Sequence, residues 1–291
     1  MLYSSKSQSP FFSEKFLSAL LELDLKQENV ELHVDSLDTL LLKIEEDSIV
    51  SVGDRNYVDY RSTSDNTRDI VHILKDSEYK KIFIDSVQFE EVQYLNKKII
   101  ESNFSINLTP SDISVYIELP KTYEEYLDNL GKKKRHELKR KLSKFTREFS
   151  EYEILKGHSK ELFISFIELH KNSSKEKEEF MTKDTQDFFY RLLSIDGWTI
   201  YLLLVKGEAV AGNFCYENEE ALYLYNSGKN KLFDPFSVGI YLTHYLIKES
   251  IRQKKKTFDL LKGSERYKFD LGGGIRQLYD IEIKKNEDTT D

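Results

Sequence analysis

The chain has 291 residues, including 18 Tyr and 18 Phe, and its 43 basic and 51 acidic residues give a formal net charge of −8 at pH 7. Its single cysteine, Cys215, excludes an intrachain disulfide and a cysteine-based metal site. The six histidines show no ligand-like spacing, so we expect no metal. The longest strongly apolar run, Ile200 to Val205, is far too short to cross a bilayer, and the N-terminus lacks the apolar core of a signal peptide. We therefore expect a folded cytoplasmic protein of one large or two ordinary domains, without a transmembrane segment.

Helical and alternating patterns follow one another through the first 120 residues. The expected elements, in chain order, are a helix at Ser13–Leu25, strands at Leu37–Ile44 and Ile49–Val52, a helix begun by Asn66 or Thr67, a strand at Lys81–Asp85, a helix striped by Phe89, Val92, Leu95 and Ile99, and a strand at Ser114–Leu119. This order predicts a first lobe in which helices pack on a mixed sheet.

A strongly basic helix is expected next. Thr122 and Glu125 fit a capping box that starts a helix at Thr122, and Gly131 then interrupts it. Between Lys132 and Arg147, nine basic residues stand against Glu137 alone, so this segment carries +8 and the rest of the chain −16. Four apolar positions share one face of the segment: Leu138, Leu142, Phe145 and Phe149. The pattern indicates an amphipathic helix whose other faces meet an anion or simply water.

The second half repeats the order of elements. It predicts helices at His158–Lys171 and Asp184–Leu193, strands at Trp198–Val205, Glu208–Tyr216 and Ala221–Asn226, a helix from Ser237 to about Arg252, and strands at Thr257–Leu261 and Leu278–Lys284. We therefore expect an α/β (α+β) protein of two related lobes, each a mixed sheet flanked by helices. The expected ranges are 1–120 for the N-terminal lobe, 121–157 for the basic linking helix and 158–291 for the C-terminal lobe.

The helix that opens at Ser237 is the first candidate for a ligand site. A helix N-terminus directs unpaired backbone N–H groups and a positive dipole end outward, which suits a phosphate or pyrophosphate. The expected cradle consists of Ser237, Val238, Gly239, Ile240 and Tyr241. The alternative is that Ser237 only caps the helix, because serine is a preferred N-cap with or without a ligand.

Four segments carry a resemblance to a known family: Leu224–Gly228, Phe236–Gly239, Phe258–Gly263 and Glu265–Lys268. In their order and spacing the chain resembles GNAT-fold acyltransferases of the BioF2-like, cellulose-biosynthesis type, which are relatives of the Fem-type aminoacyl ligases. The resemblance is best from about Thr122 to Lys284. Where such proteins carry a glycine-rich pyrophosphate loop, this chain has only Gly239, and Val238 stands where relatives often have proline. The implied donor is acyl-CoA, with acetyl-CoA expected; the alternative is an aminoacyl-tRNA.

The resemblance also implies roles for residues near the fourth strand of the second half. The donor's pantetheine arm would lie where the strands Ala221–Asn226 and Thr257–Leu261 splay, and Tyr267 would protonate the leaving thiolate. Lys268 would stabilise an oxyanion or a phosphate. The alternatives are a packed aromatic for Tyr267 and a solvated side chain for Lys268.

Carboxylates are the next candidates for chemistry. Asp259 and Glu265 are the nearest candidates for a general base, and a lone aspartate in an apolar strand requires either a partner or a function. His170 and His244 are weaker base candidates, because each lies within a predicted helix.

Two groups could contact the acceptor. Tyr225 and Asn226 end a predicted strand and could line an acceptor pocket, although packing alone would explain Tyr225. Lys133, Lys134 and Arg135 could dock a phosphorylated acceptor, a lipid-linked sugar at a membrane surface, or tRNA. Peripheral membrane contact is therefore open, and tRNA is the less favoured partner because the chain is acidic overall.

The expected function is transfer of an acyl group from acyl-CoA to an amino group. The resemblance alone implies the acceptor, an amino sugar of cell-envelope or polysaccharide synthesis. The alternatives are an aminoacyl-tRNA-dependent ligase of Fem type and a non-catalytic binding protein with a decayed cofactor site.

Overall fold

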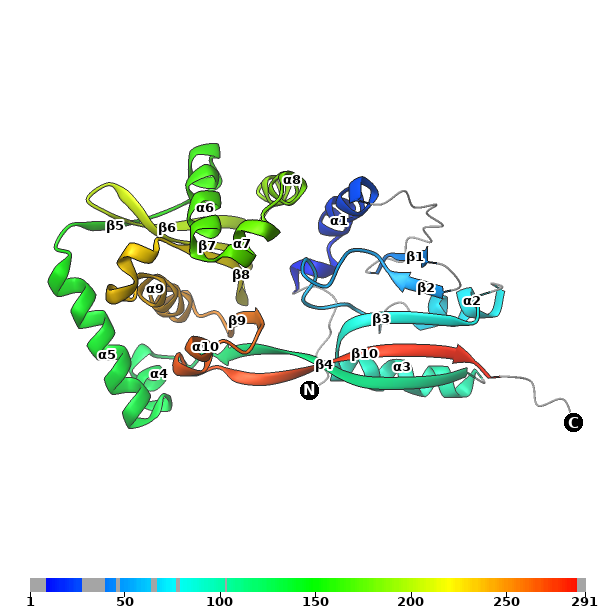
Figure 1. The fold of residues 1–291 in the computed structure, drawn as a ribbon. Helices are drawn as coiled ribbons and strands as arrows, with labels where there is room; N and C mark the ends of the chain where they lie inside the picture. The colour runs from blue at the N-terminus through cyan, green and yellow to red at the C-terminus, as the bar shows by residue number, and fades with distance from the viewer. Residues whose placement is uncertain are drawn as a thin grey trace, which may run out of the picture. The chain divides into compact units, whose positions relative to one another are not determined.

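The computed structural model describes residues 9–27, 40–45, 48–63, 67–76, 79–102 and 104–286. The chain forms two compact units: Met1–Ser114 together with Arg276–Asp291, and Val115–Ile275. Two long strands, β4 (Phe104–Glu118) and β10 (Gly274–Lys285), run through both units (Figure 1). None of the helices in the described ranges is both long and apolar enough to cross a membrane.

The first unit contains one mixed sheet with helices. Its other elements are η1 (Pro10–Phe12), α1 (Glu14–Gln27), β1 (Leu42–Glu45), β2 (Ser48–Ser51), α2 (Thr67–Asp76), β3 (Lys81–Gln88) and α3 (Phe89–Glu101). The strand order is β1-β2-β3-β10-β4. β2 and β3 are parallel, whereas β1 with β2 and β3 with β10 are antiparallel. The parallel pair needs a crossover, which α2 supplies.

The second unit contains the longer series of elements. They are α4 (Tyr123–Asn129), α5 (Gly131–Glu148), β5 (Tyr152–Gly157), α6 (Lys160–Ser173), α7 (Lys175–Phe180), α8 (Lys183–Leu192), β6 (Trp198–Val205), β7 (Glu208–Glu217), β8 (Ala221–Lys229), η2 (Lys231–Phe236), α9 (Val238–Arg252), β9 (Thr257–Lys262) and α10 (Arg266–Asp270). The strand order is β4-β9-β8-β7-β6-β5. β5 to β8 form an antiparallel meander, and β8 with β9 is parallel.

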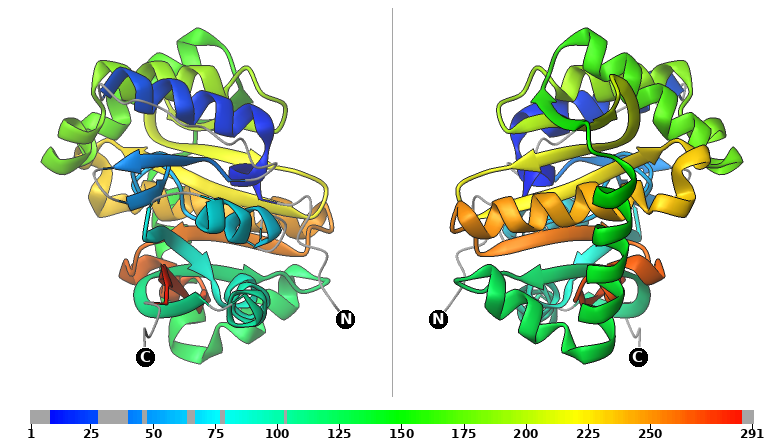
Figure 2. Two further views of the ribbon diagram at one scale, coloured as in Figure 1. Left: turned by 90° about the vertical axis from the view of Figure 1, so that its right-hand side faces the viewer. Right: turned by 90° about the vertical axis from the view of Figure 1, so that its left-hand side faces the viewer.

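Helices cover both faces of this second sheet, as the views in Figures 1 and 2 show. On β6, Tyr201 and Leu203 belong to the buried cluster that includes Leu242 of α9. On the other face, Phe166 of α6 packs against Phe214 of β7. Burial on both faces explains why β6 is a continuous apolar run rather than an alternating one.

The expectation of a mixed α/β fold built from two lobes is confirmed, but the compact units do not coincide with the expected ranges 1–120, 121–157 and 158–291. The basic helix α5 lies inside the second unit, where Leu138 and Phe145 are buried. The C-terminal part of β10 belongs to the first unit, because it pairs antiparallel with β3.

Most element boundaries agree with the sequence patterns, and several segments differ. Thr122 caps α4 as expected, with Glu125 N donating to Thr122 Oγ1 at 3.2 Å. β4 begins ten residues earlier than the predicted strand at Ser114, β10 begins four residues earlier than the one at Leu278, and β5, α7 and α10 were not predicted. Residues 37–39 of one expected strand, and the proposed cap Asn66, lie outside the described residues.

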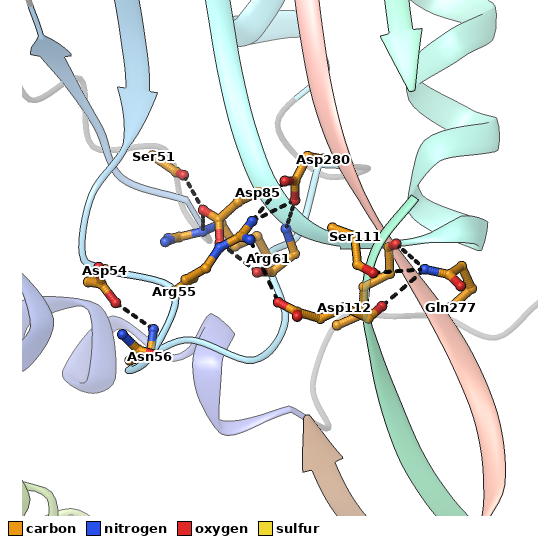
Figure 3. A network of polar contacts seen from close by, with 12 residues as sticks. Ser51, Asp54, Arg55, Asn56, Arg61, Asp85, Ser111, Asp112, Gln277 and Asp280 are labelled. Carbon is orange, nitrogen blue, oxygen red and sulfur yellow. Dashed lines mark hydrogen bonds and ion pairs between the residues drawn. The ribbon is translucent and has the colours of Figure 1, made fainter. Parts of the chain in front are cut away.

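A buried arginine fills the point where the parallel strands of the first unit end (Figure 3). Arg61, 3% exposed, donates from Nη1 to Val52 O at 2.8 Å and from Nη2 to Gly53 O at 2.6 Å. Its Nε lies 2.7 Å from Asp85 Oδ1 on β3. Because each hydrogen-bonding group has an acceptor, the guanidinium joins the end of β2 to β3 without an uncompensated buried charge.

We expect Arg61→Met to lower the free energy of unfolding by about 3–5 kcal/mol, because it leaves the Asp85 carboxylate buried without its counter-charge. The matched control is Arg55→Met. Arg55 is 41% exposed and pairs with Asp280 at 2.8 Å, so its loss should cost less than about 1 kcal/mol. Urea unfolding of both variants measures the difference, and equal losses would contradict a buried ion pair as the anchor.

Candidate functional site

The parallel strands of the second unit part early. β8 and β9 are paired only at Ala221↔Thr257, Leu222↔Phe258 and Tyr223↔Asp259, although β8 continues to Lys229 and β9 to Lys262. The ladder of β8 with β7 also shifts register between Phe214↔Asn226 and Cys215↔Leu224, so Tyr225 is the extra residue of a β-bulge. A bulge leaves backbone groups unpaired and turns them away from the ladder. The polar groups of the site are therefore expected where the two strands diverge.

Side chains of the second unit cover the outer edge of β8 beyond the parting. Lys229 N donates to Ser173 Oγ at 2.8 Å, and Ser227 N donates to Asn226 Oδ1 at 3.0 Å. Lys177 Nζ donates to Ser227 O. Side chains thus satisfy the backbone groups of Ser227 and Lys229 beyond the point where β8 and β9 part.

Lys177 was not identified from the sequence, where it lies in an ordinary charged run. Burial lowers the pKa of its amino group to about 8, with Lys229 and Lys268 adding to the effect and Glu265 opposing it. At neutral pH a measurable fraction of this amine is therefore uncharged. The electrostatic influence of Glu265 and Lys268 also places both residues near Lys177.

His170 lies behind the same edge of β8. It is 1% exposed, and its Nε2 lies 2.7 Å from Asn226 Oδ1. Gly228 allows this packing, because a Cβ there would lie 2.4 Å from His170 N. Burial lowers the pKa of His170 to about 3, followed in size by the influence of Lys177. The ring is therefore neutral, and it positions Asn226.

At the opening of α9 the backbone has the helix N-terminus predicted for an anion site, but the Ser237 side chain takes no part in it. Ser237 adopts a left-handed conformation, φ 56° and ψ 40°, and its side chain makes no capping hydrogen bond. A Cβ on Gly239 would meet only Lys229 Cδ, at 3.9 Å, so there is room beside the helix end. Ile240 is partly buried at the same end. Capping by the Ser237 hydroxyl, the alternative to an anion site, is not observed.

Two residues of the expected cradle pack inward. Val238 is fully buried. The ring of Tyr241 stacks on Phe145 at 3.9 Å between centroids, and its hydroxyl donates to Tyr152 Oη at 2.7 Å. An anion at this helix end would therefore be held by backbone N–H groups, with the Lys229 side chain alongside.

The end of β9 and the residues after it are joined by a compact network of hydrogen bonds and one ion pair. Asp259 is 2% exposed, and its Oδ1 accepts a hydrogen bond from Leu261 N at 2.9 Å, which supports the left-handed φ of 59° at Leu261. Lys268 Nζ donates to Leu261 O at 3.3 Å and pairs with Glu265 Oε2 at 3.1 Å. It also donates to Lys262 O and to Gly263 O. Such contacts favour a positioning role for Lys268; direct catalysis by Lys268 stays a prediction.

Glu265 and Tyr267 differ in access. The Glu265 side chain is 58% exposed, so it is open to solvent and to an acceptor. Tyr267 packs against the core, and burial, with a smaller effect of Glu265, raises the pKa of its phenol. The phenol is therefore protonated at neutral pH, as a proton donor must be.

The predicted acceptor contacts are not gathered in one place. Tyr225 packs among aromatic rings, 5.3 Å from Phe189 and 5.1 Å from Trp198 between centroids. Lys133 and Lys134 are exposed on α5, and Arg135 pairs with Asp128 at 2.5 Å. Of this set, only the neighbours Tyr225 and Asn226 lie on β8 near the parting of the strands.

A second buried histidine, His244, has a partner that the sequence did not predict. His244 Nε2 lies 2.7 Å from Tyr123 Oη and joins α9 to α4, and Lys248 Nζ sits over the Tyr123 ring. Burial lowers the pKa of His244 to about 4, with a contribution from Lys248. No sequence pattern marks this pair, because its members are 121 residues apart. Among the described residues, no cluster of His, Cys, Asp or Glu could hold a metal ion.

Comparison with known proteins identifies the fold. Residues 132–269 match the family model of the acetyltransferase (GNAT) domain. A conserved protein of unknown function from Bacteroides thetaiotaomicron is 14% identical over 94% of this chain and 92% of its own, with a TM-score of 0.58. The C-terminal domain of a putative lysylphosphatidylglycerol synthetase from Agrobacterium fabrum is 10% identical over the same shares, with a TM-score of 0.60. FemX is 11% identical over 83% of both chains, with a TM-score of 0.57. No curated protein matches this sequence.

We expect the two buried histidines to make stability fall as pH drops from 7 to 5. In the unfolded chain both rings take up a proton near pH 6.5, whereas in the folded protein they stay neutral down to about pH 3 and pH 4. The native state is therefore penalised below pH 6.5, by about 2 kcal/mol for each ring at pH 5.

Urea unfolding at pH 7 and pH 5 tests this expectation. His170→Gln and His244→Gln should each flatten the pH dependence, whatever their effect at pH 7. His136→Gln, a change at an exposed position of α5, should leave the slope as it is. If the buried variants kept the full slope, these rings would not be the neutral groups described.

Proposed function

Because residues 132–269 match the GNAT-type acetyltransferase family model, we propose that the second unit is an N-acyltransferase that holds an acyl-CoA donor where β8 and β9 part. The observation that carries the proposal is the early parting of these two parallel strands, with a bulge at Tyr225 and the open end of α9 following β8 along the chain. The match to the domain supports a transferase, and the choice of donor is the further step.

We assign roles in this reaction to two sets of backbone N–H groups and, below, to two side chains. The backbone N–H groups at Val238, Gly239 and Ile240, beside Lys229, would hold the donor's pyrophosphate. A backbone N–H where β8 and β9 part would stabilise the carbonyl oxygen as it gains charge.

The proton transfers fall to two side chains after β9. Glu265, which is exposed, would accept the proton that the attacking amine loses, and Tyr267, whose phenol is protonated, would give one to the leaving thiolate. Lys268 and Asp259 would hold the segment that carries both, through the carbonyl of Leu261 and its N–H.

The proposed donor can pair with the edge of β8 only if it displaces side chains that are hydrogen-bonded there. A pantetheine arm would pair with the backbone of Ser227 and Lys229, which Lys177 and Ser173 now satisfy. Lys177 is the easier to displace, because burial disfavours its charged amine and lowers the pKa of that amine to about 8. The acceptor we propose is an amine, with an amino sugar or a lipid-linked sugar as the specific candidates.

An aminoacyl-tRNA-dependent ligase is the second candidate. The observation in its favour is the same covered edge of β8, because a donor without a pantetheine arm needs no strand edge. The exposed cations of α5 would then meet the tRNA backbone. A non-catalytic protein that binds neither donor is the third candidate.

We expect Gly239→Glu to abolish donor binding, because it places a carboxylate where backbone N–H groups would meet the pyrophosphate. Gly239→Ala is the matched control, since its Cβ would have only an ordinary contact with Lys229. Thermal unfolding with acetyl-CoA measures binding: donor at 100 times its dissociation constant should stabilise the wild type and Gly239→Ala by about 2.7 kcal/mol.

The outcomes separate the three candidates. Loss of the shift in Gly239→Glu alone supports the acyl-CoA site. A shift with aminoacyl-tRNA but with no acyl-CoA indicates the ligase. Stabilisation by neither donor indicates a binding protein, and stabilisation of Gly239→Glu by acetyl-CoA would place the donor elsewhere.

A further inference from the structure

The outer face of α5 is a long cationic surface. The helix has 18 residues, which corresponds to about 27 Å, and it runs along the outside of the second unit in the right-hand view of Figure 2. Its buried residues, Leu138 and Phe145, face the core. The exposed basic side chains are Lys132, Lys133, Lys134, Lys139, Arg140 and Arg147.

Few of these cations are neutralised within the protein. Glu137 pairs with Arg140 at 2.7 Å and with Lys141 at 3.8 Å. Within the ranges that the structure describes, no ion pair involves Lys132, Lys133, Lys134, Lys139 or Arg147. The charge excess of the sequence is therefore available at the surface.

An exposed apolar tip adjoins the C-terminal half of this helix. Lys144 Nζ donates to Pro235 O of η2 at 2.8 Å, and Phe149 packs against Phe236 at 4.8 Å between centroids. These contacts fix η2 beside α5. On η2, Leu232 is 82% exposed, more than any other large apolar side chain among the described residues, and Lys231 beside it is exposed as well.

We propose that α5 and η2 together, the α5–η2 surface, dock onto the surface of an anionic lipid bilayer. Clustered lysines and arginines are attracted to anionic headgroups, and an adjacent aliphatic side chain can enter the interface. The rest of the chain carries −16, so an anionic membrane repels it and the protein approaches only through this surface.

The exposed apolar side chain of Leu232 favours lipid over nucleic acid as the partner of this surface. A phosphodiester backbone would also attract the cations, but it gives Leu232 no apolar environment. Base stacking would call for aromatic rings among the cations, and no Phe, Tyr or Trp lies among the exposed residues of α5. Lipid uses both features of the surface. The proposal concerns binding alone and does not depend on the transferase reaction.

Sedimentation with vesicles tests the proposal on the full chain. The protein should bind vesicles of phosphatidylcholine that contain phosphatidylglycerol, should not bind vesicles of phosphatidylcholine alone, and should be released by salt. Changing Lys132, Lys133 and Lys139 to Glu should reduce partitioning at least about 100-fold. The matched control, Lys160, Lys175 and Lys183 to Glu, makes the same charge change at exposed positions of α6, α7 and α8 and should bind far better than the α5 variant.

Leu232→Ser separates the two kinds of partner. It should weaken vesicle binding roughly tenfold and leave binding to a double-stranded RNA unchanged. The proposal is overturned if the wild type ignores phosphatidylglycerol vesicles, or if the control variant loses as much binding as the α5 variant. It is also overturned if Leu232→Ser binds vesicles as well as the wild type does, because the surface would then recognise charge alone.

Discussion

Every arrangement at the candidate site follows from one constraint: β8 leaves its parallel neighbour after three residue pairs and must satisfy its backbone without it. Buried backbone groups without partners are too costly to persist. Here Ser173, Asn226 and Lys177 supply the partners at the outer edge of β8. The shape of the site therefore depends on whether a ligand can replace these internal groups as the hydrogen-bond partners of the β8 backbone.

The same constraint appears at two further strand ends among the described residues, and a buried cation satisfies the backbone carbonyls at each. In the first unit Arg61 binds the carbonyls of Val52 and Gly53. After β9, Lys268 binds the carbonyl of Leu261 and its neighbours. The two differ in what balances the charge, because Asp85 is buried beside Arg61 whereas Glu265 is largely exposed beside Lys268. The segment after β9 is therefore the one of these two that presents a charged side chain to solvent or to a ligand.

The sequence predicted the elements that have a regular pattern. β6, α9 and the capping box at Thr122 were found close to their observed positions, because their signals are local. β5 was missed, since its exposure pattern does not alternate cleanly. The compact units were not foreseen either, because the pairing of β10 with β3 joins segments almost 200 residues apart and no local signal encodes it.

The site residues themselves stay predictions, but parts of their setting could be read from the sequence. The start of α9 has a local pattern, and the parting of β8 and β9 was implied by the resemblance to GNAT-fold acyltransferases. Lys177 and the partners of His170 and His244 were not, since contacts across the fold decide their burial and their pKa values. Lys268 stays a predicted site residue, and its several carbonyl partners could only come from the structure.

The inner face of α5 links its outer face to the site. Phe145 stacks on Tyr241, three residues into α9, while Lys144 and Phe149 hold η2, which leads directly into that helix. The cations that face solvent and the N–H groups at the opening of α9 therefore belong to one packed body, with little freedom between them. A partner bound to the α5–η2 surface would therefore be held at a fixed position relative to the opening of α9.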